Sequence, residues 1–264
     1  MKKSKVRILL LIAIVLFGIY IAWENLTVGL TRYTFAEPDL PSTFDGFRVA
    51  HVSDLHNSNL WKQVIDLLES SNPDIICITG DLVDFSHTNV ERALDFAAKA
   101  VKIAPCYYIT GNHELVLDGA VREQLLRDLE EIGVTVLHNR EVVLDSDGEQ
   151  ISLYGASWGS LSYMGSESSA HYRILLAHAP EDFPSYATAG FDLVLSGHVH
   201  GGQFRIPLIG GVYGPGQGLF PKYDSGIYSD GETDMVLSRG IGNSVIPIRI
   251  LNQPEVILIQ LKCV

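Results

Sequence analysis

Five apolar segments of this chain end in the same way, and this repetition constrains the fold more than any other feature. After each segment the chain reaches a Gly or a sharp turn and then Asp, Asn or His. In layered α/β folds, the loops beyond the carboxyl ends of strands are where functional sites are assembled. We therefore expect these polar side chains to meet at one edge of a sheet. They are Asp54, His56, Asp81, Asn112, His113, His178, His198 and His200.

The hydrophobic pattern alternates between strand and helix in the first half of the chain and is mostly strand in the second. Strands are predicted over residues 31–36, 47–52, 74–79, 106–110, 134–138, 141–145, 150–154, 173–177, 191–196, 235–238, 246–250 and 255–261. Helices are predicted over residues 60–70, 89–102, 121–132 and 181–189, and the Gly- and Pro-rich residues 201–231 predict irregular structure. This order indicates an α/β fold with a mixed β core and helices outside.

The N-terminus carries an unbroken apolar run, Ile8 to Trp23, after a basic cluster at residues 2–7. As a helix it spans about 24 Å, slightly less than the ~30 Å hydrocarbon core of a bilayer. A signal peptide has the same layout but needs a small-residue cleavage site, and Ala22-Trp23-Glu24-Asn25 supplies none. We expect an uncleaved single-pass anchor over residues 1–31, with the body at residues 32–264 on the extracytoplasmic side of the cell membrane.

Charge narrows the possible partners. The net charge of the chain is −12, and residues 1–31 hold four basic side chains and one acidic, so the remainder carries −15. Such a body repels a phosphate backbone, which argues against nucleic acid as a partner. The odd cysteine count, with Cys77 and Cys106 inside apolar runs, argues against a disulfide framework or a zinc–cysteine site. A body this acidic needs bound cations to act on phosphates.

The eight polar side chains have the chemistry of metal ligands. A mixed set of imidazoles and carboxylates suits Mn, Fe, Zn, Co or Ni better than Ca or Mg. Seven of them, all but His113, are more than one tetrahedral ion can take. They fit two divalent ions about 3.5–4 Å apart, the arrangement that clamps both oxygens of an in-line displacement. One carboxylate must then bridge the ions, and Asp81 is central in chain order.

These residues stand in five linked motifs. The motifs are Asp54-x-His56, Gly80-Asp81, Gly111-Asn112-His113-Glu114, His178 and Gly197-His198-x-His200. In this order they resemble the motif set of the calcineurin-like metallophosphoesterases, over about residues 47–203. The continuation through Gly201-Gly202-Gln203, Tyr213-x-Pro215-Gly216 and Ser238-Arg239-Gly240 resembles the membrane-associated bacterial branch. That branch includes phosphodiesterases and proteins similar to UDP-2,3-diacylglucosamine hydrolases.

The resemblance implies a four-layer α/β/β/α sandwich and two metal ions, with manganese favoured. One ion would be held by Asp54, His56, Asp81 and His200, and the other by Asp81, Asn112, His178 and His198. A bridging hydroxide would attack phosphorus, while His113 would steady or protonate the leaving oxygen. The sequence departs from two relatives: Phe85 follows Asp84 where Ser/Thr protein phosphatases carry Arg, and His113 stands where the lipid A-pathway hydrolases carry Arg.

We therefore expect a membrane-anchored, metal-dependent phosphodiesterase acting on a small or lipid-linked phosphoester. The alternatives are a phosphomonoesterase, a nucleotide-lipid pyrophosphatase of the UDP-2,3-diacylglucosamine type, and a silent metal-binding scaffold.

Several residues outside this set have two interpretations. His51, His87, His138 and His171 lack partner spacing and are predicted to be structural or surface residues. Asp84 is either a turn cap or a support for the ligands, and Glu114 either caps the segment after it or serves the site. Gln203 and Arg205 either line the pocket or lie in a solvated loop. Residues 210–223 form either an irregular surface loop or an apolar lip for an amphiphilic phosphate.

Overall fold

A computed structural model describes residues 2–158, 170–243 and 246–264. Two six-stranded sheets form its centre. The first has the order β1 (Gly29–Glu37), β16 (Glu255–Cys263), β2 (Arg48–Val52), β3 (Ile75–Ile78), β4 (Cys106–Tyr108), β5 (Thr135–Val136). The second has the order β14 (Gly226–Asp230), β15 (Thr233–Leu237), β9 (Leu193–Ser196), β8 (Tyr172–Leu176), β7 (Glu149–Gly155), β6 (Arg140–Ser146).

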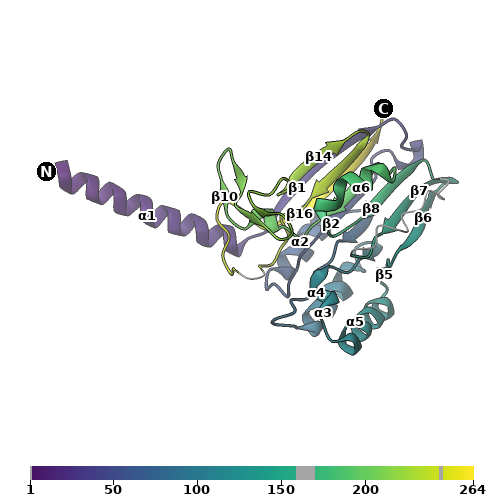
Figure 1. The fold of residues 1–264 in the computed structure, drawn as a ribbon, viewed down its shortest axis with the longest axis horizontal. Coiled ribbons are helices and arrows are strands. Elements are labelled where there is room, and N and C mark those ends of the chain that lie inside the picture. The colour runs from purple at the N-terminus through teal and green to yellow at the C-terminus, as the bar shows by residue number, and fades with distance from the viewer. Residues whose placement is uncertain (1, 159–169, 244–245) are drawn as a thin grey trace.

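Helices cover the outer faces of both sheets, so the body has four layers (Figure 1). The first sheet packs against α2 (Trp61–Ser71), α3 (Val90–Ala100) and α5 (Gly119–Ile132), and the second packs against the short α6 (Phe183–Thr188). Short helical turns lie at η1 (Ser42–Phe44), η3 (Pro180–Asp182), η4 (His200–Gly202) and α4 (Asn112–Leu115). This arrangement confirms the expected α/β/β/α sandwich.

The alternation of side chains along the strands explains the layers. In β3, Ile75 and Cys77 lie in the core between the sheets, whereas Ile76 and Ile78 pack against the helices. Because successive side chains of a strand point to opposite faces, a strand covered on both sides is apolar throughout. β9 follows the same rule, with Leu193 and Leu195 between the sheets. Cys77 and Cys106 are buried core residues, as expected.

Strand direction decides where the functional residues go. β2, β3, β4 and β5 are parallel in the first sheet, and β7, β8, β9 and β15 are parallel in the second. Parallel neighbours have their carboxyl ends at the same edge, so the segments after β2, β3, β4, β8 and β9 meet there. The fold therefore creates a single place for the five motifs.

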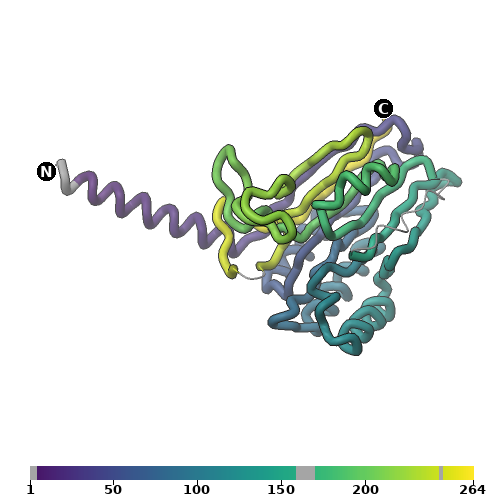
Figure 2. Tube along the Cα trace, viewed as in Figure 1, coloured from purple at the N-terminus to yellow at the C-terminus, as the bar shows by residue number. Residues whose placement is uncertain are grey.

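The N-terminal helix α1 (Lys2–Leu26) projects away from this body (Figure 2). Its segment Lys5–Leu26 is long and apolar enough to cross a membrane. β1 begins at Gly29 and pairs with β16 from there, so the sheet starts before the expected boundary at residue 31. Glu24 at the end of the helix is buried against the body.

Two predictions about the C-terminal third are wrong. Residues 246–250 form no strand, and only Ile250 makes an isolated bridge, to Phe204. Residues 201–231 contain more regular structure than expected: β10 (Arg205–Ile206) pairs with β11 (Gly210–Gly211), β12 (Tyr213–Gly214) pairs with β13 (Gly218–Leu219), and β14 joins the second sheet. The glycines that predicted a loop allow these tight hairpins.

Candidate metal centre

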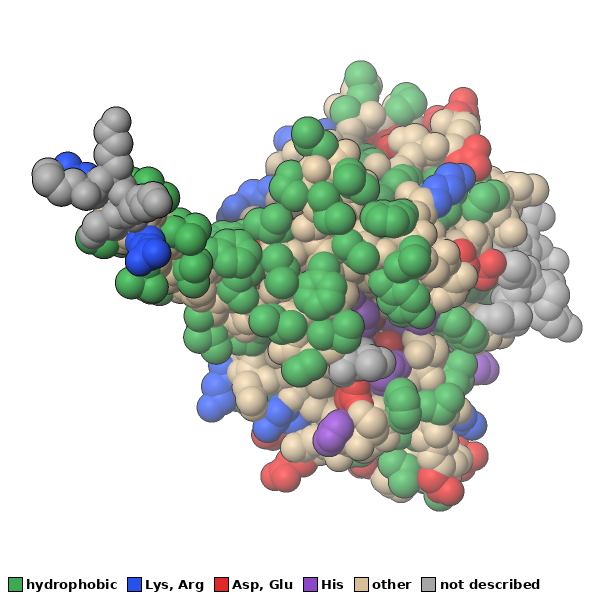
Figure 3. Space-filling model, turned by 60° about the vertical axis from the view of Figure 1, so that its left-hand side comes forward, with side chains coloured by type: hydrophobic (Ala, Val, Ile, Leu, Met, Phe, Trp, Pro, Cys, Tyr) green, Lys and Arg blue, Asp and Glu red, His purple; other side chains and the backbone are tan. Residues whose placement is uncertain are grey.

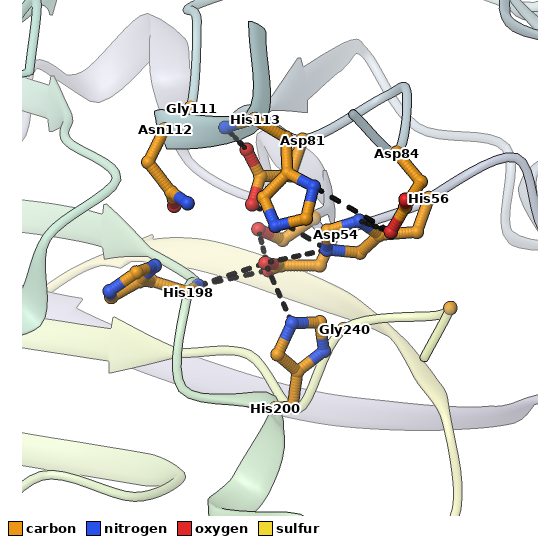
Figure 4. A network of polar contacts seen from close by, with 12 residues as sticks. Asp54, His56, Asp81, Asp84, Gly111, Asn112, His113, His198, His200 and Gly240 are labelled. Carbon is orange, nitrogen blue, oxygen red and sulfur yellow. Dashed lines mark hydrogen bonds and ion pairs between the residues drawn. The ribbon is translucent and has the colours of Figure 1, made fainter. Parts of the chain in front are cut away.

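All eight predicted site residues lie together at the shared edge of the two sheets. Figure 4 labels all of them except His178. Asp54 and His56 follow β2, and Asp81 follows β3. Asn112 and His113 open α4 after β4. From the second sheet, His178 follows β8, and His198 and His200 follow β9. All but Asn112, which is half-buried, are buried.

Asp54 lies at the centre of one group of donors. Its Oδ1 is 3.7 Å from His56 Nε2, 3.6 Å from His200 Nε2 and 4.0 Å from His178 Nε2. The backbone N–H of His198 donates to both carboxylate oxygens, at 3.1 and 3.0 Å, and Ser53 Oγ donates to Oδ2 at 2.5 Å. These bonds hold the carboxylate so that it faces three imidazoles at once.

Asp81 lies between the donors that follow the first sheet and those that follow the second. Its Oδ2 is 3.5 Å from His56 Nε2 and 3.2 Å from His178 Nε2, while Oδ1 accepts the His113 N–H at 2.8 Å. The His178 Nε2 atom also lies 3.2 Å from Asn112 Oδ1. Asp81 therefore belongs to donor groups on both sides.

The donors form three overlapping groups whose atoms all lie within 4.8 Å of one another. The groups are Asp54, His56 and His200; Asp81, His178 and His198; and His56, Asp81 and His113. The first contains three members of one ligand set implied by the family resemblance, without Asp81, and the second contains three members of the other, without Asn112. The third places His113 at the same cluster.

The spacing of these atoms fits metal ions better than direct hydrogen bonds. Two donors bound at about 2.1 Å to one ion lie about 3.0–4.2 Å apart, depending on the angle between them, and most of this range is longer than a good N–H···O bond. The imidazole–carboxylate distances run from 3.2 to 4.0 Å. Both ring nitrogens of His56 are buried and lie 3.4–3.7 Å from carboxylate oxygens, farther than in a good hydrogen bond. The residues present therefore fit divalent cations.

The backbone accepts unfavourable conformations to aim these side chains. Asp54, His56, Asp81, His198 and His200 all have positive φ, between 44° and 76°. Such values are uncommon for residues other than glycine and concentrate at functional sites. Close approach explains the neighbouring glycines: a Cβ on Gly197 would lie 1.9 Å from Ser53 Oγ, and one on Gly111 would lie 2.1 Å from Asp81 Oδ1.

Charge is unevenly distributed over the imidazoles. Burial lowers the pKa of His200 to about 3 and that of His198 to about 4. Burial also opposes protonation of His56 and His178, but the adjacent carboxylates outweigh it and raise their pKa values to about 10 and about 9. Metal ions bind neutral imidazole, so His56 and His178 would have to lose these protons to act as ligands.

Glu114 has a larger role than the sequence predicted. It is fully buried and accepts the N–H groups of Asp81 (2.9 Å), Gly111 (2.8 Å) and Val83 (3.1 Å). Burial and Asp81 raise its pKa to about 7. One carboxylate thus caps α4 and also ties the loop after β3 to the loop after β4. Its position next to His113 in the third motif was the only sequence signal.

Asp84 fulfils both roles that the sequence left open. Its Oδ1 caps the turn by accepting from Ser86 N at 2.8 Å. Its Oδ2 lies 3.4 Å from His56 Nδ1 and 3.6 Å from His113 Nδ1. Burial works against its charge, but His56 and Ser86 hold its pKa far below the usual range. Asp84 therefore supports His56 from behind, as carboxylates do around metal-binding histidines, and lies beside His113.

Two supporting residues were missed entirely. Trp158 packs against the rings of His178 and His198, with centroids 5.5 and 4.8 Å away. Arg249 is fully buried and places Nη2 3.4 Å from His200 Nδ1. Neither residue lies near a motif in the sequence, so local spacing carries no signal for them.

The four histidines outside the motifs are structural or surface residues, as predicted. His51 is buried and bonds Thr79 Oγ1 through Nε2 at 2.8 Å, while His87, His138 and His171 are exposed. Gln203 lines the cavity at the site, and Arg205 lies in the adjoining surface hairpin.

A cavity of about 380 Å³ opens above the donors. Its floor consists of Asp81, Asn112, His113, His198 and His200. Its walls are Phe85, Val199, Gln203, Tyr213, Pro215 and Ile246. No Lys or Arg lines it within the ranges that the structure describes. The cavity joins a polar floor to a mainly apolar wall.

Comparison with known proteins agrees with this geometry. The calcineurin-like phosphoesterase family model matches residues 47–202. The uncharacterized metallophosphoesterase YkuE of Bacillus subtilis is 32% identical over 89% of this chain and 86% of its own length. The phosphodiesterase YaeI of Escherichia coli is 30% identical over 81% of this chain and 82% of its own. A transmembrane protein with a metallophosphoesterase domain from Danio rerio is 25% identical, over 84% of this chain and 55% of its own.

The matched residues 47–202 begin at β2 and end in η4, so they contain all five motifs. More than half of the chain falls within this match, and two bacterial relatives at 30% identity or more extend it over most of the remainder. The chain therefore belongs to the calcineurin-like metallophosphoesterases and is a metal-dependent hydrolase of phosphoric esters.

Proposed function

We propose that this protein is a membrane-anchored phosphodiesterase that works with two divalent metal ions. The observation that carries the proposal is the pair of donor groups that share one buried edge, with Asp81 between them. Asp54, His56, Asp81 and His200 would hold one ion. Asp81, Asn112, His178 and His198 would hold the other, with Mn favoured among Mn, Fe, Zn, Co and Ni. When bound, such ions activate water and offset charge on phosphoryl oxygens.

We propose that His113 acts on the leaving group. Its Nδ1 accepts the backbone N–H of Phe85 at 3.2 Å, so a neutral ring carries its proton on Nε2. The ring lines the cavity floor. We assign His113 the role of donating this proton, or a hydrogen bond, to the leaving oxygen.

The cavity favours a diester over a monoester. A monoester carries up to two negative charges, and proteins bind such groups with Arg or Lys. The residues that line this cavity in the described ranges supply neither. A diester carries one negative charge, which metal ions at the floor could offset, and two substituents, one of which could lie against the apolar wall. The relative YaeI is named a phosphodiesterase, in agreement with this preference.

The N-terminal helix supports membrane association. Its segment Lys5–Leu26 has the length and composition to cross a bilayer, and the Danio rerio relative is named a transmembrane protein. The basic residues at its start favour an inside position for that end. We propose that α1 is an uncleaved anchor and that the body from β1 onward lies on the extracytoplasmic side.

Hydrolysis by the full chain in detergent micelles tests the proposal. Bis(p-nitrophenyl) phosphate and p-nitrophenyl phosphate are compared in the presence of Mn²⁺, alongside Asp81→Asn. We expect faster turnover of the diester and loss of both activities in Asp81→Asn. Preferred turnover of the monoester would overturn the diester assignment. Activity that survives in Asp81→Asn would overturn the shared role of Asp81.

A further inference from the structure

We propose that an exposed apolar surface beside the cavity rests in the bilayer interface next to α1. The active site then opens toward the membrane and takes a phosphodiester carried by an amphiphile. The substrate part of this inference rests on the proposed function, whereas the membrane contact does not depend on catalysis. We call this surface the apolar face. It consists of Ile206, Leu208, Ile209, Leu219, Phe220, Ile246, Ile248 and Leu251.

The apolar face is unusual for a surface in contact with water. Leu208 is completely exposed, and Ile209, Leu219 and Phe220 are each more than half exposed. Figure 3 shows hydrophobic side chains continuing from α1 over this side of the molecule to the hollow that contains histidines. Large contiguous apolar patches mark interaction sites. Exposed apolar residues elsewhere on the body, such as Val116, Val143 and Ile227, lie in separate elements.

Backbone conformation provides a second observation. Leu208, Phe220 and Leu251 have φ values of 69°, 54° and 54°. A large apolar residue in this region is strained, and a glycine would relieve the strain. None of the three is buried, so packing in the body does not explain these residues. An apolar medium that covers these three side chains would explain why large apolar residues occupy strained, exposed positions.

Hydrogen bonds fix the end of α1 beside the apolar face. Glu24 Oε2 accepts the N–H of Leu251 at 2.9 Å. Asn25 exchanges two bonds of 2.8 Å with the backbone N–H and C=O of Arg249. Gln63 of α2 donates to Leu26 O at 2.9 Å. Because the helix end is held at several points, a membrane-spanning α1 brings residues 249–251 to the bilayer surface.

The apolar face also continues into the active-site cavity. Ile246 belongs to both, and Tyr213, which lines the cavity, pairs with Leu219 across the β12–β13 hairpin. Gln203 Nε2 donates to the carbonyls of Ile246 (2.7 Å) and Ile248 (2.6 Å), which ties the cavity wall to the apolar face. An amphiphile lying in the bilayer can therefore present its headgroup phosphodiester to the metal floor.

Lipid-dependent quenching tests the membrane contact. The full chain carrying Cys263→Ser is labelled with an NBD fluorophore at Leu208→Cys or, as the control, at Val143→Cys on β6. Each protein is placed singly in nanodiscs of phosphatidylcholine and phosphatidylglycerol. Doxyl lipids should quench the label at position 208 several-fold more than the label at 143. Equal quenching would overturn the proposal, as would a blue shift at 208 that depends on protein concentration, which indicates a second copy of the chain.

A charge variant tests the substrate class. Asp tolerates positive φ, so Leu208→Asp/Phe220→Asp keeps the backbone while removing the apolar contact. Hexadecyl p-nitrophenyl phosphate in vesicles and soluble bis(p-nitrophenyl) phosphate are compared, with Val143→Asp as the matched control. We expect the variant to lose at least tenfold on the vesicle substrate and to stay within twofold on the soluble one. Equal losses on both, or none, would overturn the membrane-facing site. A wild-type protein inactive on both would instead refute the proposed function.

Discussion

The metal centre and the apolar face differ in how the chain builds them. The metal centre is buried and consists of residues at the ends of paired parallel strands, held by bonds such as those from Glu114 and Ser53. The residues of the apolar face lie in two-residue strands, in the turns beside them and in the irregular segment 246–251. The candidate catalytic residues thus lie at the edge of the two sheets, whereas the surface proposed to meet the substrate lies on short hairpins. The two regions should respond separately to perturbation.

Removal of metal should have the largest effect. We expect a chelator to reduce diester hydrolysis by about 10³-fold or more, because the ions supply several kcal/mol of transition-state stabilisation. The melting temperature should also fall, since the bound ions stabilise the folded state only. Added Mn²⁺ should restore both properties. Lipid quenching of the label at position 208 should not change, and a change there would show that the two regions are coupled.

Glu114→Gln should have the next largest effect, confined to the metal centre. The amide replaces one of two acceptor oxygens with a donor, so it cannot satisfy the N–H groups of Asp81, Gly111 and Val83 together. We expect a loss of about 1–3 kcal/mol in the free energy of unfolding and about 10–100-fold in activity. Urea denaturation measures the free energy of unfolding, and diester kinetics measure the activity.

The exposed Glu123→Gln on α5 is the control for this variant. Its free energy of unfolding should stay within about 0.5 kcal/mol of the wild type. Similar behaviour of the two variants would show that Glu114 does not organise the site.

Gln203→Asn tests the connection between the two regions. Asn tolerates the φ of 59° at this position, but its amide is too short to bond Ile246 O and Ile248 O as Gln203 does. We expect a modest rise in KM for the vesicle substrate, about 2–10-fold, with kcat nearly unchanged, because about 0.4–1.4 kcal/mol of positioning is lost. A fall in kcat with unchanged KM would place Gln203 in the metal centre instead.

The smallest expected effect is on thermal stability, at Glu37, which belongs to neither the metal centre nor the apolar face. Burial, with Asp234, Asp192 and Asp39, raises the pKa of Glu37 from 4.5 to about 7. Its charged form therefore destabilises the fold, and this penalty develops as pH rises from 4.5 through 7. Glu37→Gln should melt slightly higher than the wild type at pH 8 and equally at pH 4. A difference that is largest at acidic pH would contradict the assigned cause, and metal-dependent activity should be unaffected.

The local hydrophobic pattern explains why a strand was wrongly predicted at residues 246–250. The alternation of Ile246, Ile248 and Ile250 predicts a half-buried strand with the isoleucines inside. In the structure the reverse holds: Ile246 and Ile248 are exposed, while Arg249 is fully buried against Arg239 O and Gly242 O. Periodicity reports that side chains alternate, but the partner surface decides which side is inside.

The four layers were expected from the family resemblance. By itself, the sequence determined most helices and strands outside residues 201–250 and the set of Asp, Asn and His residues that follow the strands. These follow from local periodicity and from motifs a few residues long. Only the tertiary structure decided that Glu114 joins two loops, that Arg249 and Trp158 support the imidazoles, and that the end of α1 lies beside the apolar face. Each of these contacts joins segments far apart in the chain, apart from the bond of Glu114 to Gly111, and side-chain spacing along a sequence carries no information about which distant segments pack together.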